Sequence, residues 1–203
     1  MTEKPHPEAI APVTRAERAA RQFHPGAVVW LTGLSGAGKS TLATALERHL
    51  FDRGLRVMVL DGDVMRTGLN SDLGFSHADR TENIRRLGEV AALLADTGTI
   101  VITALISPYV ADRVRARQRL GQLNNSLPFI EVYVDAPLSV CEQRDPKGLY
   151  VRARAGQIAE FTGVSDPYEA PATPDIHVRT DQAPLEECVR LVVTRLLADL
   201  DAR

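Results

Sequence analysis

The chain has 203 residues, 44% of them hydrophobic, which is enough for one buried core and leaves little room for a second full domain. Its formal charge of -2, from 24 basic and 26 acidic residues, argues against a protein that coats nucleic acid, because any basic surface must be local. We see no signal peptide and no run of about 18 apolar residues, and the two cysteines lack metal-ligand spacing, so we expect a cytoplasmic protein without membrane or nucleic-acid partners.

The amino-terminal segment 1–25 is rich in Pro, Ala, Arg and Glu, and we interpret it as a tail in which residues 14–22 suit one short polar helix. Residues 26–203 are expected to form a single domain. There, short apolar runs alternate with longer helical patterns, which is typical of βαβ units in a parallel sheet.

Five apolar runs rich in Val and Ile are predicted to be strands, at residues 27–31, 56–61, 99–105, 129–134 and 175–178. Helical patterns cover residues 39–52, 79–97, 111–120, 138–144 and 184–200. The strands show little polar alternation, so we expect helices on both faces. This predicts a three-layer α/β/α fold of the P-loop NTPase type, with a mostly parallel sheet of about five strands. Gly54 and Gly98 directly follow helical patterns, where left-handed caps favour glycine.

The most specific motif is GLSGAGKS at residues 33–40, which matches G-x-x-x-x-G-K-[ST] between an apolar run and a helix-forming run. Backbone N–H groups of such a loop surround phosphate oxygens, Lys39 reaches the β and γ phosphates, and Ser40 can bind Mg²⁺. The alternative is an ordinary glycine-rich turn. We predict ATP and Mg²⁺ as cofactors, Lys39 as a catalytic residue, and an ATP site made of Gly33, Leu34, Ser35, Gly36, Ala37, Gly38, Lys39, Ser40, Thr41 and Arg144.

Two carboxylates, Asp61 and Asp63, end the second predicted strand, at the sheet edge where ligands of α/β proteins bind. Asp63 can orient an acceptor hydroxyl or take its proton, and Asp61 can organise Mg²⁺ through water or hold the loop. The alternative for Asp63 is that it only caps a helical turn that begins near Val64.

Basic and aromatic side chains suggest an anionic acceptor. Arg80 and Asn83 are three residues apart and therefore share a helix face, and Arg66 lies upstream; forked guanidinium groups with a neighbouring amide suit a phosphate or sulfate. A solvated face of Arg–Glu pairs is the alternative. Phe75 and Phe161 lie in predicted loops, where they stack on a base or serve as core anchors.

Taken in order, five segments resemble adenylylsulfate kinases: GLSGAGKST, LDGDVMRTGLNSDLGFSHADRTENIRRLGEVA, ISPY, DAPLSVCEQRDPKGLY and RARAGQIAEFTGVSDPYEAP. The resemblance covers residues 29–180. It implies transfer of phosphate from MgATP to the ribose 3′-hydroxyl of adenosine 5′-phosphosulfate. It also implies an acceptor pocket lined by Asp63, Arg66, Phe75, Arg80, Asn83, Ile106, Ser107, Lys147, Leu149 and Phe161.

Within this resemblance, Phe75 and Phe161 are implied to sandwich the acceptor adenine, and residues 145–168 to form a mobile lid; a rigid surface helix is the alternative. Ser107 occupies a position sometimes described in the family as a phosphoserine intermediate. Direct in-line transfer needs positioning more than a covalent relay, and neither His nor Lys adjoins Ser107 in sequence, so we assign it a hydrogen bond to the acceptor.

Two positions depart from the common family spelling: Val64 replaces an amide residue, and Leu105 replaces a phenylalanine before ISPY. The resemblance suggests a homodimer and a functional link to ATP sulfurylase. Two further hypotheses stay open from sequence, namely a P-loop kinase of another small anionic metabolite and a non-catalytic nucleotide-binding regulatory partner.

Overall fold

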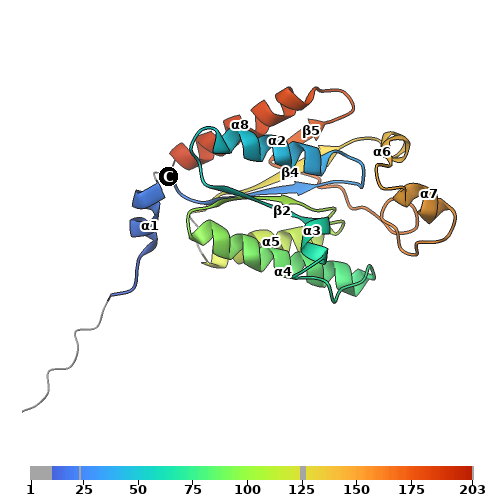
Figure 1. Ribbon diagram of the computed structural model, residues 1–203, viewed down its shortest axis with the longest axis horizontal. Coiled ribbons are helices and arrows are strands. Elements are labelled where there is room, and N and C mark those ends of the chain that lie inside the picture. Colours follow the sequence, from blue (N-terminus) through green and yellow to red (C-terminus); the bar gives the residue numbers. More distant parts are fainter. Residues whose placement is uncertain (1–10, 23, 124–126, 203) are drawn as a thin grey trace, which may run out of the picture.

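The computed structural model describes residues 11–22, 24–123 and 127–202. They contain a five-stranded sheet in the order β2-β3-β1-β4-β5, with every neighbouring pair parallel (Figure 1). The strands are β1 (Ala27–Thr32), β2 (Val57–Asp61), β3 (Ile100–Ala104), β4 (Phe129–Asp135) and β5 (Ile176–Arg179). All five predicted strands are confirmed. Because they are parallel, their carboxyl ends meet at one edge of the sheet.

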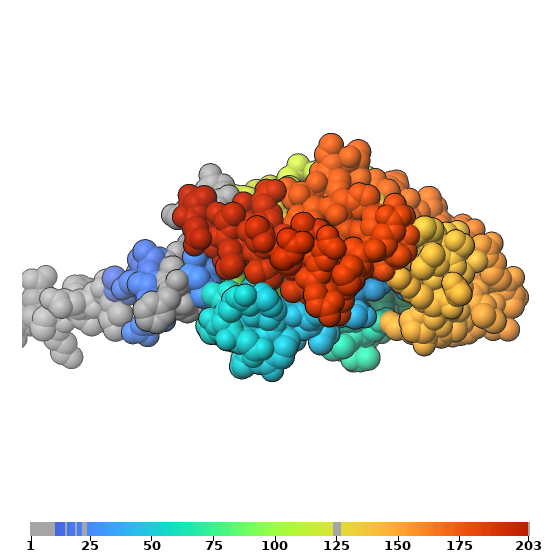
Figure 2. Space-filling view, turned by 90° about the horizontal axis from the view of Figure 1, so that it is seen from above, coloured from blue at the N-terminus to red at the C-terminus, as the bar shows by residue number. Residues whose placement is uncertain are grey.

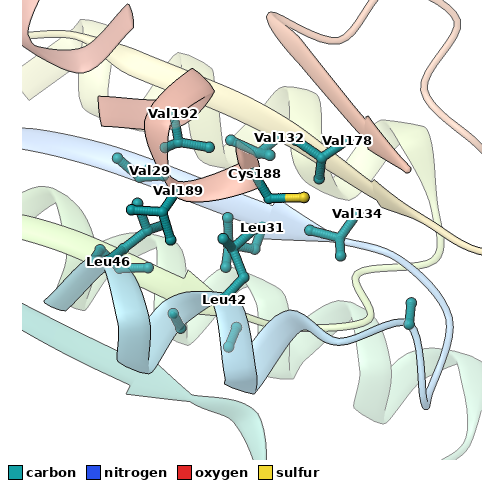
Figure 3. Packing of buried hydrophobic residues seen from close by; sticks show 14 of the residues in the cluster. Val29, Leu31, Leu42, Leu46, Val132, Val134, Val178, Cys188, Val189 and Val192 are labelled. Carbon is teal, nitrogen blue, oxygen red and sulfur yellow. The ribbon is translucent and has the colours of Figure 1, made fainter. Parts of the chain in front are cut away.

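Helices cover both faces, as the Val- and Ile-rich strands predicted (Figure 1). The helices α2 (Lys39–Phe51) and α8 (Leu185–Asp201) pack on one face, and α4 (His77–Asp96) and α5 (Val110–Leu123) pack on the other. Alternate residues of β1 serve the two cores: Val29 and Leu31 face α2 and α8, and Val28 and Trp30 face α4 and α5. Figure 3 shows Leu31 between side chains of α2 and Cys188 of α8.

Helix ends follow local capping chemistry. Ser76 caps α4 by accepting a hydrogen bond from the Asp79 backbone N–H, so this helix starts at His77, two residues before the predicted start. Gly54 and Gly98 have φ of 78° and 91°, which confirms the predicted left-handed caps. The helix α6 (Leu138–Arg144) has the predicted bounds.

Two short helices were not predicted as such, α3 (Gly62–Arg66) and α7 (Leu149–Arg154). Both lie beside the carboxyl ends of the strands, α3 directly after β2 and α7 within the predicted lid. In the space-filling view, α8 and α2 lie side by side and the segment with α6 and α7 forms one end of the molecule (Figure 2).

The helix α1 (Arg15–Gln22) matches the short helix predicted in the tail and lies outside the three layers in Figure 1. The first ten residues of that predicted tail are outside the described part of the chain. Among the described helices, none combines the length and apolar character needed to cross a membrane.

Candidate active site

A cavity of about 1020 Å³ opens at the carboxyl edge of the sheet. Its walls come from the loop after β1, from α3 and α4, from the loop after β3, from the segment around α7, and from the residues before and at the start of α8. Its size is at the upper end of the usual range for ligand pockets, about 300–1,000 Å³.

The glycine loop after β1 is shaped by two backbone requirements. A Cβ on Gly33 would lie 2.2 Å from the carbonyl oxygen of Val134, so only glycine fits this close approach. Gly38 precedes α2 with φ of 95°, the left-handed conformation that glycine adopts at no steric cost. The amino end of α2, with its partial positive charge, therefore opens directly into the cavity.

Lys39 is the buried cation of this loop, with 9% of the residue exposed. Its Nζ donates to the carbonyl oxygens of Gly33 and Leu34 at 2.9 and 2.6 Å. Burial lowers the pKa of Lys39 to about 8, with nearby Lys147 acting in the same direction and Cys141, Asp61 and Asp63 opposing. Among the described residues, this ammonium group has two carbonyl partners and no anionic one at hydrogen-bond distance, so a phosphate would supply the negative charge that it lacks.

Side chains from distant segments support the loop. Arg144 donates to the carbonyl oxygens of Gly36 and Thr180 at 3.2 and 2.9 Å, and the Thr180 hydroxyl donates to Ala37 O at 2.8 Å. The Tyr150 hydroxyl donates to Ser35 O at 2.9 Å. Sequence reasoning missed Thr180 and Tyr150. Thr180 directly follows β5, and this strand-end position is the signal that could have identified it.

Of the ten predicted ATP-binding residues, seven line the cavity: Ser35, Gly36, Gly38, Lys39, Ser40, Thr41 and Arg144. Gly33, Leu34 and Ala37 do not line it. Gly33 and Leu34 contribute the carbonyl groups that hold Lys39, and Ala37 is completely buried.

The two carboxylates after β2 have different surroundings. Asp61 accepts hydrogen bonds from Ser40 Oγ at 2.7 Å and from the Asp63 backbone N–H at 2.9 Å, so Asp61 is the N-cap of α3. The alternative that Asp63 caps this helical turn is therefore wrong, because Asp63 lies inside the first turn. Its side chain instead forms an ion pair with Lys147 at the cavity.

The predicted Mg²⁺ ligands, Ser40 and Asp61, are within hydrogen-bond distance of each other beside the phosphate loop. No three His, Cys, Asp or Glu side chains of the described residues cluster as a metal cage. This oxygen pair fits Mg²⁺, which keeps several waters and is commonly held by one or two protein oxygens together with substrate phosphates.

One wall of the cavity lies across α3 and α4 and consists of two arginines, Arg66 and Arg80, and the neutral amide residue Asn83; we call it the basic wall. Arg80 and Asn83 are both buried on α4 and both line the cavity, which confirms that they share a face. Arg80 donates to the carbonyl oxygens of Phe75 and Glu160 at 2.9 and 2.7 Å. Arg66 donates to Gly74 O at 2.8 Å and lies over the Phe75 ring at 4.4 Å. Burial lowers the pKa of Arg66, and neighbouring Arg80 lowers it further.

The two phenylalanines differ in exposure. Phe75 is 56% exposed on its loop, and the guanidinium groups of Arg66 and Arg80 lie over its ring. Phe161 is 6% exposed and packs edge-on against Tyr150, with 5.0 Å between the ring centroids. Phe161 thus belongs to the main core, as the core-anchor alternative expected, and it also lines the cavity.

Ser107 lies in the loop after β3 with its backbone in the left-handed region, at φ of 41°, and is 2% exposed. Its Oγ accepts a hydrogen bond from Trp30 Nε1 at 3.2 Å. A tryptophan ring nitrogen only donates, so this partner cannot act as a base for the Ser107 hydroxyl, and the Ser107 proton remains available for a ligand.

All ten residues assigned to the acceptor pocket line this one cavity: Asp63, Arg66, Phe75, Arg80, Asn83, Ile106, Ser107, Lys147, Leu149 and Phe161. At the two departures from the family spelling, Val64 is 66% exposed and Leu105 is buried, with its side chain 3.0 Å from where a Cβ on Gly62 would lie.

Hydrogen bonds order the start of the predicted lid internally and fasten its end to the loop after β3. At its start, the Asp145 carboxylate accepts from the backbone N–H groups of Leu149, Tyr150 and Val151. At its end, the Tyr109 hydroxyl donates to Asp166 at 3.0 Å. Buried Arg113, which sequence reasoning also missed, donates to the carbonyl oxygens of Ser107 and Glu169.

Comparison with known proteins relates most of this chain to one family. A family model described as adenylylsulphate kinase matches residues 25–179. The adenylyl-sulfate kinase of Saccharomyces cerevisiae is 54% identical over 187 residues, covering 92% of this chain and 92% of that protein. The adenylyl-sulfate kinase of Yersinia pestis is 56% identical over 177 residues, covering 87% and 80%.

A solved structure shows the same relationship in three dimensions. The APS kinase of Mycobacterium tuberculosis in complex with AMPPNP and APS is 48% identical to this chain, with a TM-score of 0.81, and the match covers 86% of this chain and 99% of that one. That relative holds an ATP analogue and adenosine 5′-phosphosulfate together.

Proposed function

The chain belongs to the adenylylsulphate kinase family, and we propose on this premise how its residues divide the work of the reaction. The protein is an adenylyl-sulfate kinase, which makes 3′-phosphoadenosine 5′-phosphosulfate from adenosine 5′-phosphosulfate and ATP. The observation that carries our assignment is that most residues of the glycine loop, Asp63 and the basic wall line one cavity.

ATP is assigned to residues 33–41, with its terminal phosphates at the amino end of α2 and beside Lys39. The buried Lys39 ammonium group attracts the phosphate oxygens, and this attraction grows as negative charge develops on them during transfer. Lys39 therefore stabilises the transition state more than the bound substrate. Arg144 and Thr180 hold the far side of the loop and extend the cavity toward the apolar residues Ala183 and Leu185, a surface that suits a base.

Ser40 and Asp61 are assigned to Mg²⁺, which when bound would neutralise charge on the donor phosphates. Ser40 Oγ donates a hydrogen bond to Asp61 at 2.7 Å, which places the two oxygen groups side by side.

Adenosine 5′-phosphosulfate is assigned to the basic wall, with its anionic group at Arg66, Arg80 and Asn83 and its adenine between Phe75 and Phe161. Asp63 is assigned to the ribose 3′-hydroxyl. The hydroxyl oxygen attacks the γ-phosphorus, its proton passes to the Asp63 carboxylate, and the bond between the γ-phosphorus and ADP breaks. Lys147, the ion-pair partner of Asp63, lies on the proposed lid, so movement of the lid would carry this cation toward or away from Asp63.

Arg80→Ala is expected to raise the KM for adenosine 5′-phosphosulfate by about 10- to 100-fold, since a hydrogen bond to a charged group contributes about 1.5–3 kcal/mol. The KM for ATP should change by less than about threefold. Arg85→Ala is the matched control, because Arg85 lies on the same helix, is 55% exposed and pairs with Glu82. Unchanged acceptor KM in Arg80→Ala would show that the basic wall is misassigned.

Ser107→Ala is expected to keep turnover within about tenfold of the unmodified protein, because it removes one hydrogen bond to the acceptor and no covalent step. Single-turnover kinetics with γ-labelled ATP, followed by mass spectrometry of the protein, distinguishes the two roles. Loss of all turnover, or a phosphate found on Ser107 of the active protein, would favour the phosphoserine intermediate.

The activity itself is tested by ADP release with ATP, Mg²⁺ and a panel of acceptors. Turnover that depends on adenosine 5′-phosphosulfate, with 3′-phosphoadenosine 5′-phosphosulfate identified as product, is the expected result. Turnover only with another acceptor would favour a kinase of a different small anionic metabolite, and binding without turnover would favour a regulatory partner.

The family resemblance also supports four further proposals. We assign a tail to residues 1–25 and a kinase domain to residues 26–203, and we propose a homodimer in the cytoplasm. We further propose that ATP sulfurylase supplies the acceptor. The two buried free thiols, Cys141 and Cys188, fit the reducing conditions of that compartment. Sedimentation of the 22.2 kDa chain tests the dimer.

A further inference from the structure

Asn70, to which neither the sequence analysis nor the proposed reaction gives a role, is a completely buried polar residue that contacts Asn83 of the basic wall. It lies in the loop after α3, where its backbone N–H donates to Met65 O and its carbonyl accepts from the Leu73 N–H. Its side-chain Nδ2 donates to Asn83 Oδ1 at 3.0 Å. Asn70 therefore joins the loop that leads to Phe75 with the helix that carries Asn83.

This hydrogen bond determines which end of the Asn83 amide faces the cavity. An amide has an acceptor oxygen at one end and two N–H donors at the other. Because Asn70 occupies the oxygen of Asn83, the Nδ2 group is left to face the cavity that Asn83 lines. No partner for this Nδ2 is found among the described residues. The wall at Asn83 thus presents donors next to the Arg80 guanidinium, which is the arrangement that an anion needs.

The reverse orientation of the two amides is less favourable. Asn70 Oδ1 is buried without a hydrogen-bond partner in the described chain. If both amides turned over together, Asn83 would donate to Asn70, and the buried group left without a partner would be an N–H₂ instead of a carbonyl oxygen. Buried N–H groups without partners are rarer than under-satisfied carbonyl groups, which reflects their cost. Reversal would also direct the Asn83 oxygen toward the bound anion.

We infer that Asn70 is a positioning residue that fixes the amide of Asn83 with its N–H₂ group toward the anionic group of the acceptor. This inference rests on the proposed acceptor site. Asn70 itself does not line the cavity, so it acts on binding through Asn83.

Asn70→Asp tests the inference with almost no change of shape. An ionised carboxylate at residue 70 only accepts hydrogen bonds, so the Asn83 amide is expected to turn its N–H₂ toward residue 70 and its oxygen toward the anion. The KM for adenosine 5′-phosphosulfate is expected to rise about tenfold or more, while kcat at saturating acceptor and the KM for ATP stay within about threefold. Asn70→Ala, which merely releases the amide, should raise the acceptor KM less, by about three- to tenfold.

A double-mutant cycle separates this role from a general packing defect. In an Asn83→Ala background, Asn70→Asp and Asn70→Ala should leave the acceptor KM unchanged beyond the effect of Asn83→Ala alone. The same acceptor KM increase with and without Asn83, an equal increase in the KM for ATP, or no effect of Asn83→Ala itself would overturn the inference. Absence of acceptor-dependent turnover in the unmodified protein would instead overturn the proposed function, and this inference with it.

Discussion

Replacing Lys39 with alanine is expected to lower kcat/KM for ATP by at least about 10³-fold. Removal of a single preorganised group that stabilises transition-state charge costs about 10²–10³-fold in other enzymes, and here the group is a full positive charge in a buried site. Lys39 is 9% exposed, so its ammonium group acts on the phosphates where it is shielded from bulk water. Initial rates of ADP release over a range of ATP concentrations measure the effect.

The control for this change is Arg48→Ala, which lies on the same helix and forms an exposed ion pair with Asp52. It should leave kcat/KM within about twofold, because exposed ion pairs contribute about 0–1 kcal/mol. Circular dichroism would verify that Lys39→Ala is folded. A folded Lys39→Ala variant with turnover within tenfold of the original would contradict the assignment of the phosphate loop.

Asp63→Asn is expected to have the second-largest effect, a fall in kcat of about 10²–10⁴-fold, the usual contribution of a positioned base. Asparagine has the same shape but cannot take the proton of the attacking hydroxyl. The KM for ATP should change little. Single-turnover measurements, in which product release does not limit the rate, give the chemical step directly.

A matched carboxylate for comparison is Asp72, which is exposed and paired with Arg86 away from the cavity. Asp72→Asn should retain turnover within about twofold. If Asp63→Asn retained a rate of the chemical step within about twofold of the unmodified protein, proton transfer to Asp63 would have no place in the mechanism. The ion pair between Asp63 and Lys147 would then have no role in the reaction.

The sequence was sufficient to predict the sheet and the large helices because each carries a strong local signal. A run such as AVVWLT has no polar alternation, and a long helix repeats its apolar residues every three to four positions. The helices α3 and α7 have five and six residues, too few for any such repeat to be visible. Both are instead stabilised by carboxylates that precede them, Asp61 and Asp145.

Some features of the candidate site could likewise be predicted from the sequence, and others could not. The phosphate loop and the strand-end carboxylates were predictable, because a parallel sheet brings them to one edge. The choice between Asp61 and Asp63 as the cap was not predictable, since two aspartates two residues apart can serve the same turn. The contacts Asn70–Asn83, Trp30–Ser107 and Arg144–Thr180 were also beyond prediction, because each joins two different elements or loops and depends on how the fold brings them together.

The central claim is that one cavity holds both nucleotides, with the terminal phosphate of ATP at Lys39 and the acceptor hydroxyl at Asp63. The most direct test is a crystal structure of this protein with a non-hydrolysable ATP analogue, Mg²⁺ and adenosine 5′-phosphosulfate. We predict the γ-phosphate within hydrogen-bond distance of Lys39 Nζ, and the ribose 3′-hydroxyl within hydrogen-bond distance of Asp63 and in line with that phosphate. An acceptor bound outside the wall of Arg66, Arg80 and Asn83, or with its 3′-hydroxyl directed away from Asp63, would contradict the account.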